Sequence, residues 1–111
     1  MNRPEELLKD FLHAYEQKDL DAISEMVSED VFLRDWNLEA SGKESLIREF
    51  SKNFATQASI EIRILRTFSS DAGTAAEIEI ALGDEQTLRV VDILGFDNDL
   101  KISSIVSYKG L

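Results

Sequence analysis

The stretch AEIEIAL, residues 76–82, alternates apolar side chains with glutamates and so has the two-residue period of a β-strand with one buried face. The stretch IEIRIL, residues 60–65, alternates in the same way. Turn-forming residues at 70–73 lie between these two stretches. Further turn-forming residues at 83–85 and 97–99 lie before and after the apolar residues 88–96, at the spacing of hairpins. The second half of the chain is therefore predicted to form four strands in meander order.

The first half has a helical period instead, and its helix starts are visible in the sequence. Pro4 suits a first helical turn, so residues 4–18 are predicted as a helix. Asp19 can cap a second helix that ends near residue 28. Residues 31–36 predict a short strand, and 37–40 predict a loop. Ser41 and Glu44 have the spacing of a capping box, which predicts that a third helix begins there.

The chain has the length of one domain, since 111 residues divided in two would leave halves too short to bury a core. No linker or repeat interrupts the order of elements. Three helices and about five strands must then form two packed layers. We therefore predict that residues 1–111 form a single α+β domain whose helices cover one face of a curved sheet.

Composition argues against several kinds of partner and site. The net charge of −10 would be repelled by phosphate backbones and by anionic lipid surfaces, so neither nucleic acid nor a membrane is expected as a partner. The chain has no cysteine, which fits a cytoplasmic location. His13 is the only histidine and is predicted to face solvent, so no metal or other cofactor is expected. Residues 97–99 contain two aspartates, but they fit a hairpin turn better than a calcium loop.

Two aspartates stand on apolar faces of predicted strands. Asp92 is in register with Leu88, Val90 and Leu94, and Asp35 shares the side of its strand with Val31 and Leu33. A buried carboxylate without a partner costs several kcal/mol, so each must be hydrogen-bonded, protonated or exposed to a cavity. Two carboxyls in one apolar pocket would differ in proton affinity, which suits general acid–base chemistry. The plain alternative is that Asp92 bonds a nearby amide or hydroxyl and Asp35 caps the loop after its strand.

A family resemblance is carried most clearly by four stretches: KDLDAI at 18–23, DVFLRD at 30–35, GKE at 42–44 and VVDILGFD at 90–97. Across nearly its full length, from Pro4 to Gly110, the chain resembles the nuclear transport factor 2-like (NTF2-like) superfamily, in particular its SnoaL-like and ketosteroid isomerase-like branch. The resemblance implies a cone-shaped, cystatin-like fold in which a bent sheet wraps a long helix and leaves an apolar pocket. It also implies a homodimer.

The resemblance further assigns roles to individual residues. It places Asp35 at the position of the general base and Asp92 at that of the protonated acid of the oxyanion hole. Phe11 lies where the isomerases carry the oxyanion-hole tyrosine, and Val27 and Phe50 lie where supporting tyrosines would be. Loss of such a donor typically costs about 10²–10³ in rate. The residues expected to line the pocket are Phe11, Tyr15, Val27, Trp36, Phe50, Phe54 and Val90.

Two functional hypotheses follow. The first is a pocket protein that binds a small apolar molecule and catalyses proton transfer beside a carbonyl, as in isomerisation or cyclisation, through Asp35 and Asp92. The second is a noncatalytic module that binds a ligand or a partner protein on the same scaffold.

The outer face of the sheet is expected to be apolar as well. Val91, Ile93 and Ile105 are predicted to lie opposite the Asp92 face, where no helix covers them. This predicts a homodimer through the sheet face.

Overall fold

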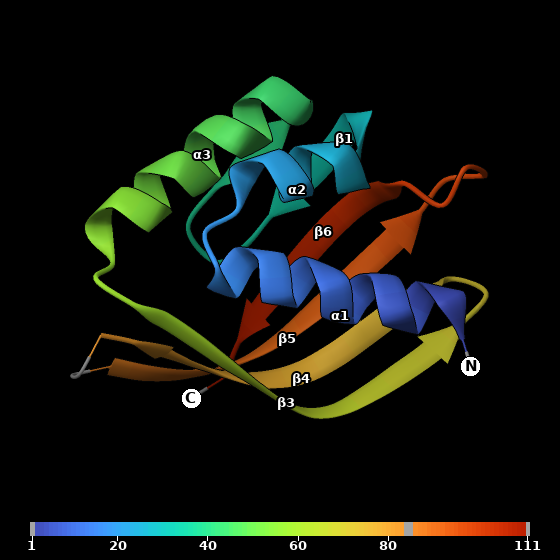
Figure 1. Ribbon diagram of the computed structural model, residues 1–111. Helices are drawn as coiled ribbons and strands as arrows, with labels where there is room; N and C mark the ends of the chain where they lie inside the picture. Colours follow the sequence, from blue (N-terminus) through green and yellow to red (C-terminus); the bar gives the residue numbers. More distant parts are fainter. Residues whose placement is uncertain (1, 84–85, 111) are drawn as a thin grey trace.

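The computed structural model describes residues 2–83 and 86–110 (Figure 1). Three helices in the first half of the chain pack on one face of a six-stranded sheet. In chain order the elements are α1 (Arg3–Glu16), α2 (Leu20–Met26), β1 (Val27–Arg34), β2 (Glu39–Ser41), α3 (Lys43–Thr56), β3 (Ile60–Ser70), β4 (Gly73–Leu82), β5 (Gln86–Phe96) and β6 (Ile102–Lys109).

The sheet has the order β2-β1-β6-β5-β4-β3. Strands β3 to β6 pair as consecutive antiparallel hairpins, which confirms the predicted meander. Strand β1 joins parallel to β6, and β2 pairs antiparallel with β1. The α+β prediction is thus confirmed. Of the predicted turn at 83–85, Gly83 has the left-handed φ of 64° that suits glycine, while Asp84 and Glu85 lie outside the described residues.

Helix α1 runs across the hollow face of the curved sheet (Figure 1). Asn2 caps it by accepting the amide of Glu5 at 3.1 Å. The helix contacts β3 and β4, whereas α3 contacts β1 and β2. These contacts bury one stripe of α1, which includes Leu8, Phe11 and Leu12, and leave a space between the two helices and the sheet.

The segment between the second and third helices differs from the prediction. Helix α2 ends at Met26 and β1 already begins at Val27, and residues 39–41 form β2 rather than a loop. The capping box is also wrong, because Gly42 is the N-cap of α3 and no side chain caps that helix. The amide of Gly42 donates to the Val31 carbonyl at 2.7 Å, and Ser41 pairs with Phe32, so the sheet holds the backbone where the capping serine was expected.

A bulge in the β5–β6 hairpin decides which side chains of β6 face inward. Phe96 lies opposite Ile102 but Gly95 lies opposite Ser104, so β6 contains one extra residue at this point. The extra residue shifts the pairing of the rest of β6 with β5 by one position. Ile105 therefore pairs with Leu94 and is buried, and the prediction that it lies on the outer face is wrong. Val106 takes that place opposite Ile93.

Candidate functional site

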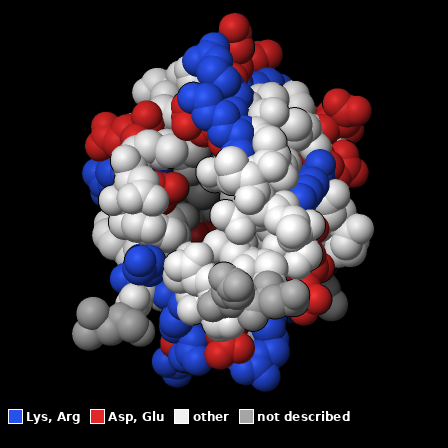
Figure 2. All heavy atoms as spheres, turned by 90° about the vertical axis from the view of Figure 1, so that its left-hand side faces the viewer, with Lys and Arg blue, Asp and Glu red and all other residues white. Residues whose placement is uncertain are grey.

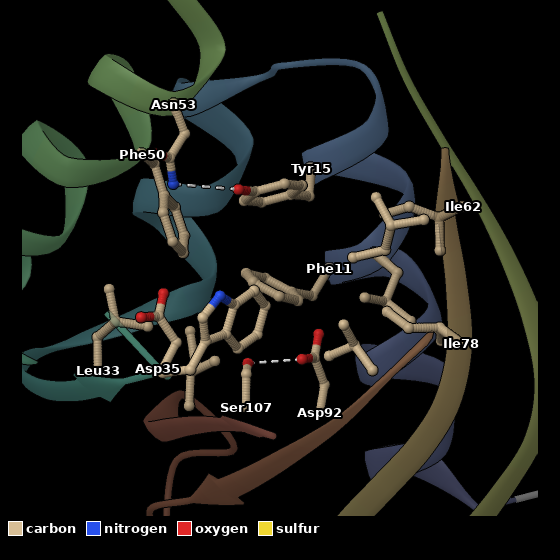
Figure 3. A pocket seen from close by; sticks show the side chains of 15 residues that line it. Phe11, Tyr15, Leu33, Asp35, Phe50, Asn53, Ile62, Ile78, Asp92 and Ser107 are labelled. Atoms are coloured by element: carbon tan, nitrogen blue, oxygen red, sulfur yellow. Dashed lines mark hydrogen bonds between the residues drawn. The ribbon is translucent and has the colours of Figure 1, made fainter. Parts of the chain in front are cut away.

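A small cavity lies where α1, α3 and the ends of β1 and β6 meet the inner face of the sheet (Figure 3). Its volume is about 80 Å³. Figure 2 shows a hollow on this side of the molecule, with acidic atoms inside it and mostly uncharged residues around it. The lining is largely apolar, and its polar members are Tyr15, Asp35, Asn53, Asp92 and Ser107.

Most of the residues expected at the pocket meet in this cavity. Its lining includes Phe11, Tyr15, Asp35, Trp36, Phe50, Val90 and Asp92.

Val27 and Phe54 are buried in the core and do not belong to the lining, so the expectation for these two residues is corrected. Val27 stands opposite Ile102 at the far end of β1 from Asp35. Phe54 lies one helical turn beyond Phe50, and its ring packs edge-on against Tyr15 at 4.8 Å between centroids.

Asp92 is the most buried carboxylate of the site, with 8% of its surface exposed. It stands on β5 directly opposite Ser107 of β6, and the Ser107 hydroxyl donates to Asp92 Oδ1 at 2.6 Å. Burial, with a smaller contribution from the negative charge of Asp35, raises the pKa of Asp92 to about 6, although the Ser107 hydrogen bond acts to lower it. Asp92 can therefore exist as a neutral hydrogen-bond donor close to physiological pH.

Asp35 follows the last residue of β1 and is half-buried. Its Oδ1 accepts the amides of Asn37 at 2.7 Å and Leu38 at 3.0 Å, so the loop cap considered from the sequence does form. Asp35 nevertheless lines the cavity. Within residues 2–83 and 86–110 the hydrogen bonds that Asp35 accepts both use Oδ1, so Oδ2 is left for a bound molecule. Asp35 therefore caps the loop and lines the cavity at the same time.

Tyr15 and Asn53 form a second polar pair in the cavity. Asn53 Nδ2 donates to the Tyr15 hydroxyl oxygen at 3.5 Å. Burial raises the pKa of Tyr15, the Asn53 hydrogen bond opposes this rise, and the charges of Asp92 and Asp35 add to it, so the phenol stays protonated at neutral pH. The sequence reasoning missed Asn53 and Ser107. Asn53 follows Phe50 by three residues on the inner face of α3, so helical spacing was a usable signal for it.

A wider outer chamber of about 390 Å³ adjoins the cavity. The two spaces share Tyr15, Asp35, Trp36, Asn53 and Ile80. Trp36 is 41% exposed, and the Lys109 ammonium, which also lines the chamber, lies 5.9 Å from the centre of its ring. The cavity therefore opens to solvent past Tyr15 and Trp36.

Other features of the described residues do not add a site. No cluster of three or more potential metal ligands occurs among residues 2–83 and 86–110. No helix in that part of the chain is long and apolar enough to span a membrane. The His13 side chain is 72% exposed, as predicted. Asp97 accepts the amides of Asp99 and Lys101, so residues 97–99 form the expected turn.

The sequence matches the SnoaL-like domain family over residues 8–105. The chain belongs to this family. No curated protein matches the sequence. A candidate SnoaL-like polyketide cyclase from Shewanella denitrificans has a similar structure, with a TM-score of 0.88, 14% identity, and coverage of 99% of this chain and 92% of the other. A candidate isomerase of the SnoaL-like family from Agrobacterium tumefaciens has a TM-score of 0.85 at 9% identity, with both chains fully covered.

An NTF2-like protein of unknown function from Cytophaga hutchinsonii is also similar to this SnoaL-like domain. Its TM-score is 0.82 at 14% identity, and the match covers 99% of this chain and 92% of the other. Together these structures show that the SnoaL-like domain has the NTF2-like fold, which confirms the predicted cone-shaped architecture. At such low identities they establish the fold alone.

Proposed function

We propose that this SnoaL-like domain binds a small, mainly apolar carbonyl compound and transfers a proton at the carbon beside the carbonyl. The observation that carries the proposal is the buried Asp92, which shares an apolar cavity with Asp35. The family membership supports a small-molecule site, and two structurally similar proteins are described as a candidate cyclase and a candidate isomerase.

The proposed chemistry divides the work between the two carboxyls. Asp35, through Oδ2, takes the proton as the carbon–hydrogen bond breaks, and the electron pair moves onto the carbonyl oxygen. Protonated Asp92 donates a hydrogen bond to that oxygen and stabilises the enolate, while Ser107 holds its other oxygen. In an isomerisation the proton then returns from Asp35 to a different carbon. In a cyclisation the enolate carbon attacks a second carbonyl, and the alkoxide oxygen that forms takes the proton from Asp35.

The acid–base assignment predicts how activity depends on pH. Asp92 must be protonated to donate, and its pKa lies at about 6. Activity should therefore fall as the pH rises through 6.

Exchange of α-protons for deuterium tests the proposal without knowledge of the natural substrate. Cyclohexanone in D₂O at pH 6 is followed by proton NMR with the wild type, Asp35→Asn and the control Asp10→Asn, since Asp10 is an exposed carboxylate on α1. We expect the wild type and the control to accelerate exchange, and Asp35→Asn to lower the rate at least 100-fold, to the buffer background, because loss of a positioned general base costs about 10²–10⁴. A ketone that binds but exchanges at the background rate would instead support the noncatalytic module.

We also propose that the domain forms a homodimer through the outer face of the sheet. An apolar row crosses four paired strands there, formed by Phe68, Ala75, Ile93 and Val106. Phe68 is 58% exposed and Ile93 is 38% exposed. Next to the row, Arg66 pairs with Glu77 at 2.7 Å, so both charge signs are available to a second copy related by a twofold axis.

Light scattering at micromolar concentration measures the mass directly. We expect a dimer for the wild type and for the control Thr87→Lys, which lies on the same face outside the apolar row. Ile93→Lys should be monomeric, because it would bury a charge at the interface. A monomeric wild type would contradict the dimer.

A further inference from the structure

Beside Asp35, the other four polar residues of the cavity form two separate pairs. Asp92 and Ser107 lie on neighbouring strands at the inner end, and Tyr15 and Asn53 lie on α1 and α3. Figure 3 shows the Tyr15 hydroxyl turned toward Asn53 on one side and the Asp92–Ser107 pair on the other, with the Phe11 ring between them. A single carbonyl oxygen bound by Asp92 would leave the second pair unused.

Tyr15 stands where the cavity meets the outer chamber. Phe11 lines the cavity only, whereas Tyr15 and Asn53 line both spaces. Tyr15 lies four positions after Phe11 on α1, which corresponds to a rise of about 6 Å toward the mouth.

The Tyr15 phenol is also free to donate. In its one hydrogen bond within the described chain it accepts from Asn53, so its own proton has no acceptor there. The tyrosine ring is held in place by edge contacts with Phe50 at 5.0 Å and Phe54 at 4.8 Å. The hydroxyl is thus a fixed donor at the junction of the two spaces, and a ligand oxygen would complete its hydrogen bonding.

The volumes indicate how a ligand must lie. An engineered apolar cavity of about 150 Å³ admits benzene, so a cavity of about 80 Å³ encloses less than one ring. A cyclic ligand whose carbonyl reaches Asp92 therefore extends past Tyr15 into the outer chamber.

We infer that Tyr15 and Asn53 form a second recognition subsite, in which the phenol donates to a second oxygen of the ligand. The ligand class is then a small compound with two oxygen functions, such as a diketone or a hydroxyketone. This inference rests on the proposed function, because Asp92 is taken to bind the first oxygen.

Two ring ketones that differ by one carbonyl test the subsite. Cyclohexanone and cyclohexane-1,4-dione are titrated into the protein, with the fluorescence of Trp36 as the readout, since Trp36 is the only tryptophan and lines the cavity. The variants are Tyr15→Phe, Asn53→Ala, and the control Tyr108→Phe, which removes the other tyrosine hydroxyl from the exposed outer face. Melting curves check that each variant is folded.

The wild type and Tyr108→Phe should bind the dione more tightly than cyclohexanone, by about 3- to 10-fold for one neutral hydrogen bond. Tyr15→Phe should abolish this preference, and Asn53→Ala should reduce it, because the phenol loses the amide that holds it. Equal binding of the two ketones by the wild type, or a preference that survives Tyr15→Phe, would overturn the subsite and leave the proposed function standing. If the wild type bound neither ketone, the proposed function would fail and the subsite with it.

Discussion

Replacing Asp92 by Asn should stabilise the protein at alkaline pH and leave its stability unchanged in acid. Burial raises the pKa of Asp92 from 3.8 to about 6 in the folded state. Below pH 3.8 the carboxyl is protonated in both the folded and the unfolded chain, so it has no effect on the free energy of unfolding. Between pH 3.8 and about 6 the unfolded chain releases this proton while the folded chain still holds it, so stability is lost over that interval and the loss is complete above pH 6.

The size of this loss follows from the shift. Each pKa unit corresponds to 1.36 kcal/mol, so the buried carboxylate costs about 3 kcal/mol of stability above pH 6. Asn has the same shape, can still accept the Ser107 hydroxyl, and has no proton to lose. We therefore expect Asp92→Asn to be more stable than the wild type by about 3 kcal/mol at pH 8, or roughly 10 °C in Tm, and equal to it at pH 3.5.

Urea unfolding followed by Trp36 fluorescence at both pH values gives the comparison, because every other ionisable group is common to the two proteins. A variant that is less stable than the wild type at pH 8, or that differs from it equally at both pH values, would refute the assignment of Asp92 as a buried, destabilising carboxylate.

Two further predictions concern single hydrogen-bonding groups. Ser107→Ala should move the titration of Asp92 above 6, because the bond that lowers its pKa is lost, and the pH dependence of unfolding would reveal the change. Lys18→Met should reduce the free energy of unfolding in urea by about 1–2 kcal/mol, since the Lys18 ammonium donates to two carbonyls at the C-terminal end of α3, whereas Lys52→Met on an exposed position of that helix should be neutral.

The strands that carry the site could be predicted because their alternation fixes the direction of each side chain. In β5 the residues at 88, 90 and 94 are apolar, so Asp92 had to face inward with them, and the structure places it there. Phe11 and Phe50 were expected at the pocket from the family resemblance, and both line the cavity.

The partner of Asp92 could not be predicted, because alternation says nothing about where a hairpin inserts an extra residue. Without the bulge at Gly95, the β5–β6 register would place Val106 opposite Asp92 and Ile105 opposite Ile93. The bulge moves Ser107 opposite Asp92 and turns Ile105 inward, so one residue of backbone decides both the hydrogen bond and the composition of the outer face.

The prediction at the start of α3 failed for a related reason. Ser41 and Glu44 have the spacing of a capping box, but β2 pairs with β1 just before the helix and leaves the cap to Gly42, whose φ of 92° suits glycine. Local motifs do not reveal such pairing between distant segments. Asp35 shows the opposite case, because the local loop cap and the position at the cavity were considered as alternatives and both occur.

Carbon-13 NMR of the aspartate carboxyls tests the central claim, that Asp35 and Asp92 act on each other within one apolar cavity. The resonance of Asp92, assigned with Asp92→Asn, should titrate with a midpoint at about 6 in the wild type, and at a lower pH in Asp35→Asn because a neighbouring negative charge has been removed. A midpoint near 3.8 in the wild type, or one that does not move in Asp35→Asn, would contradict the account.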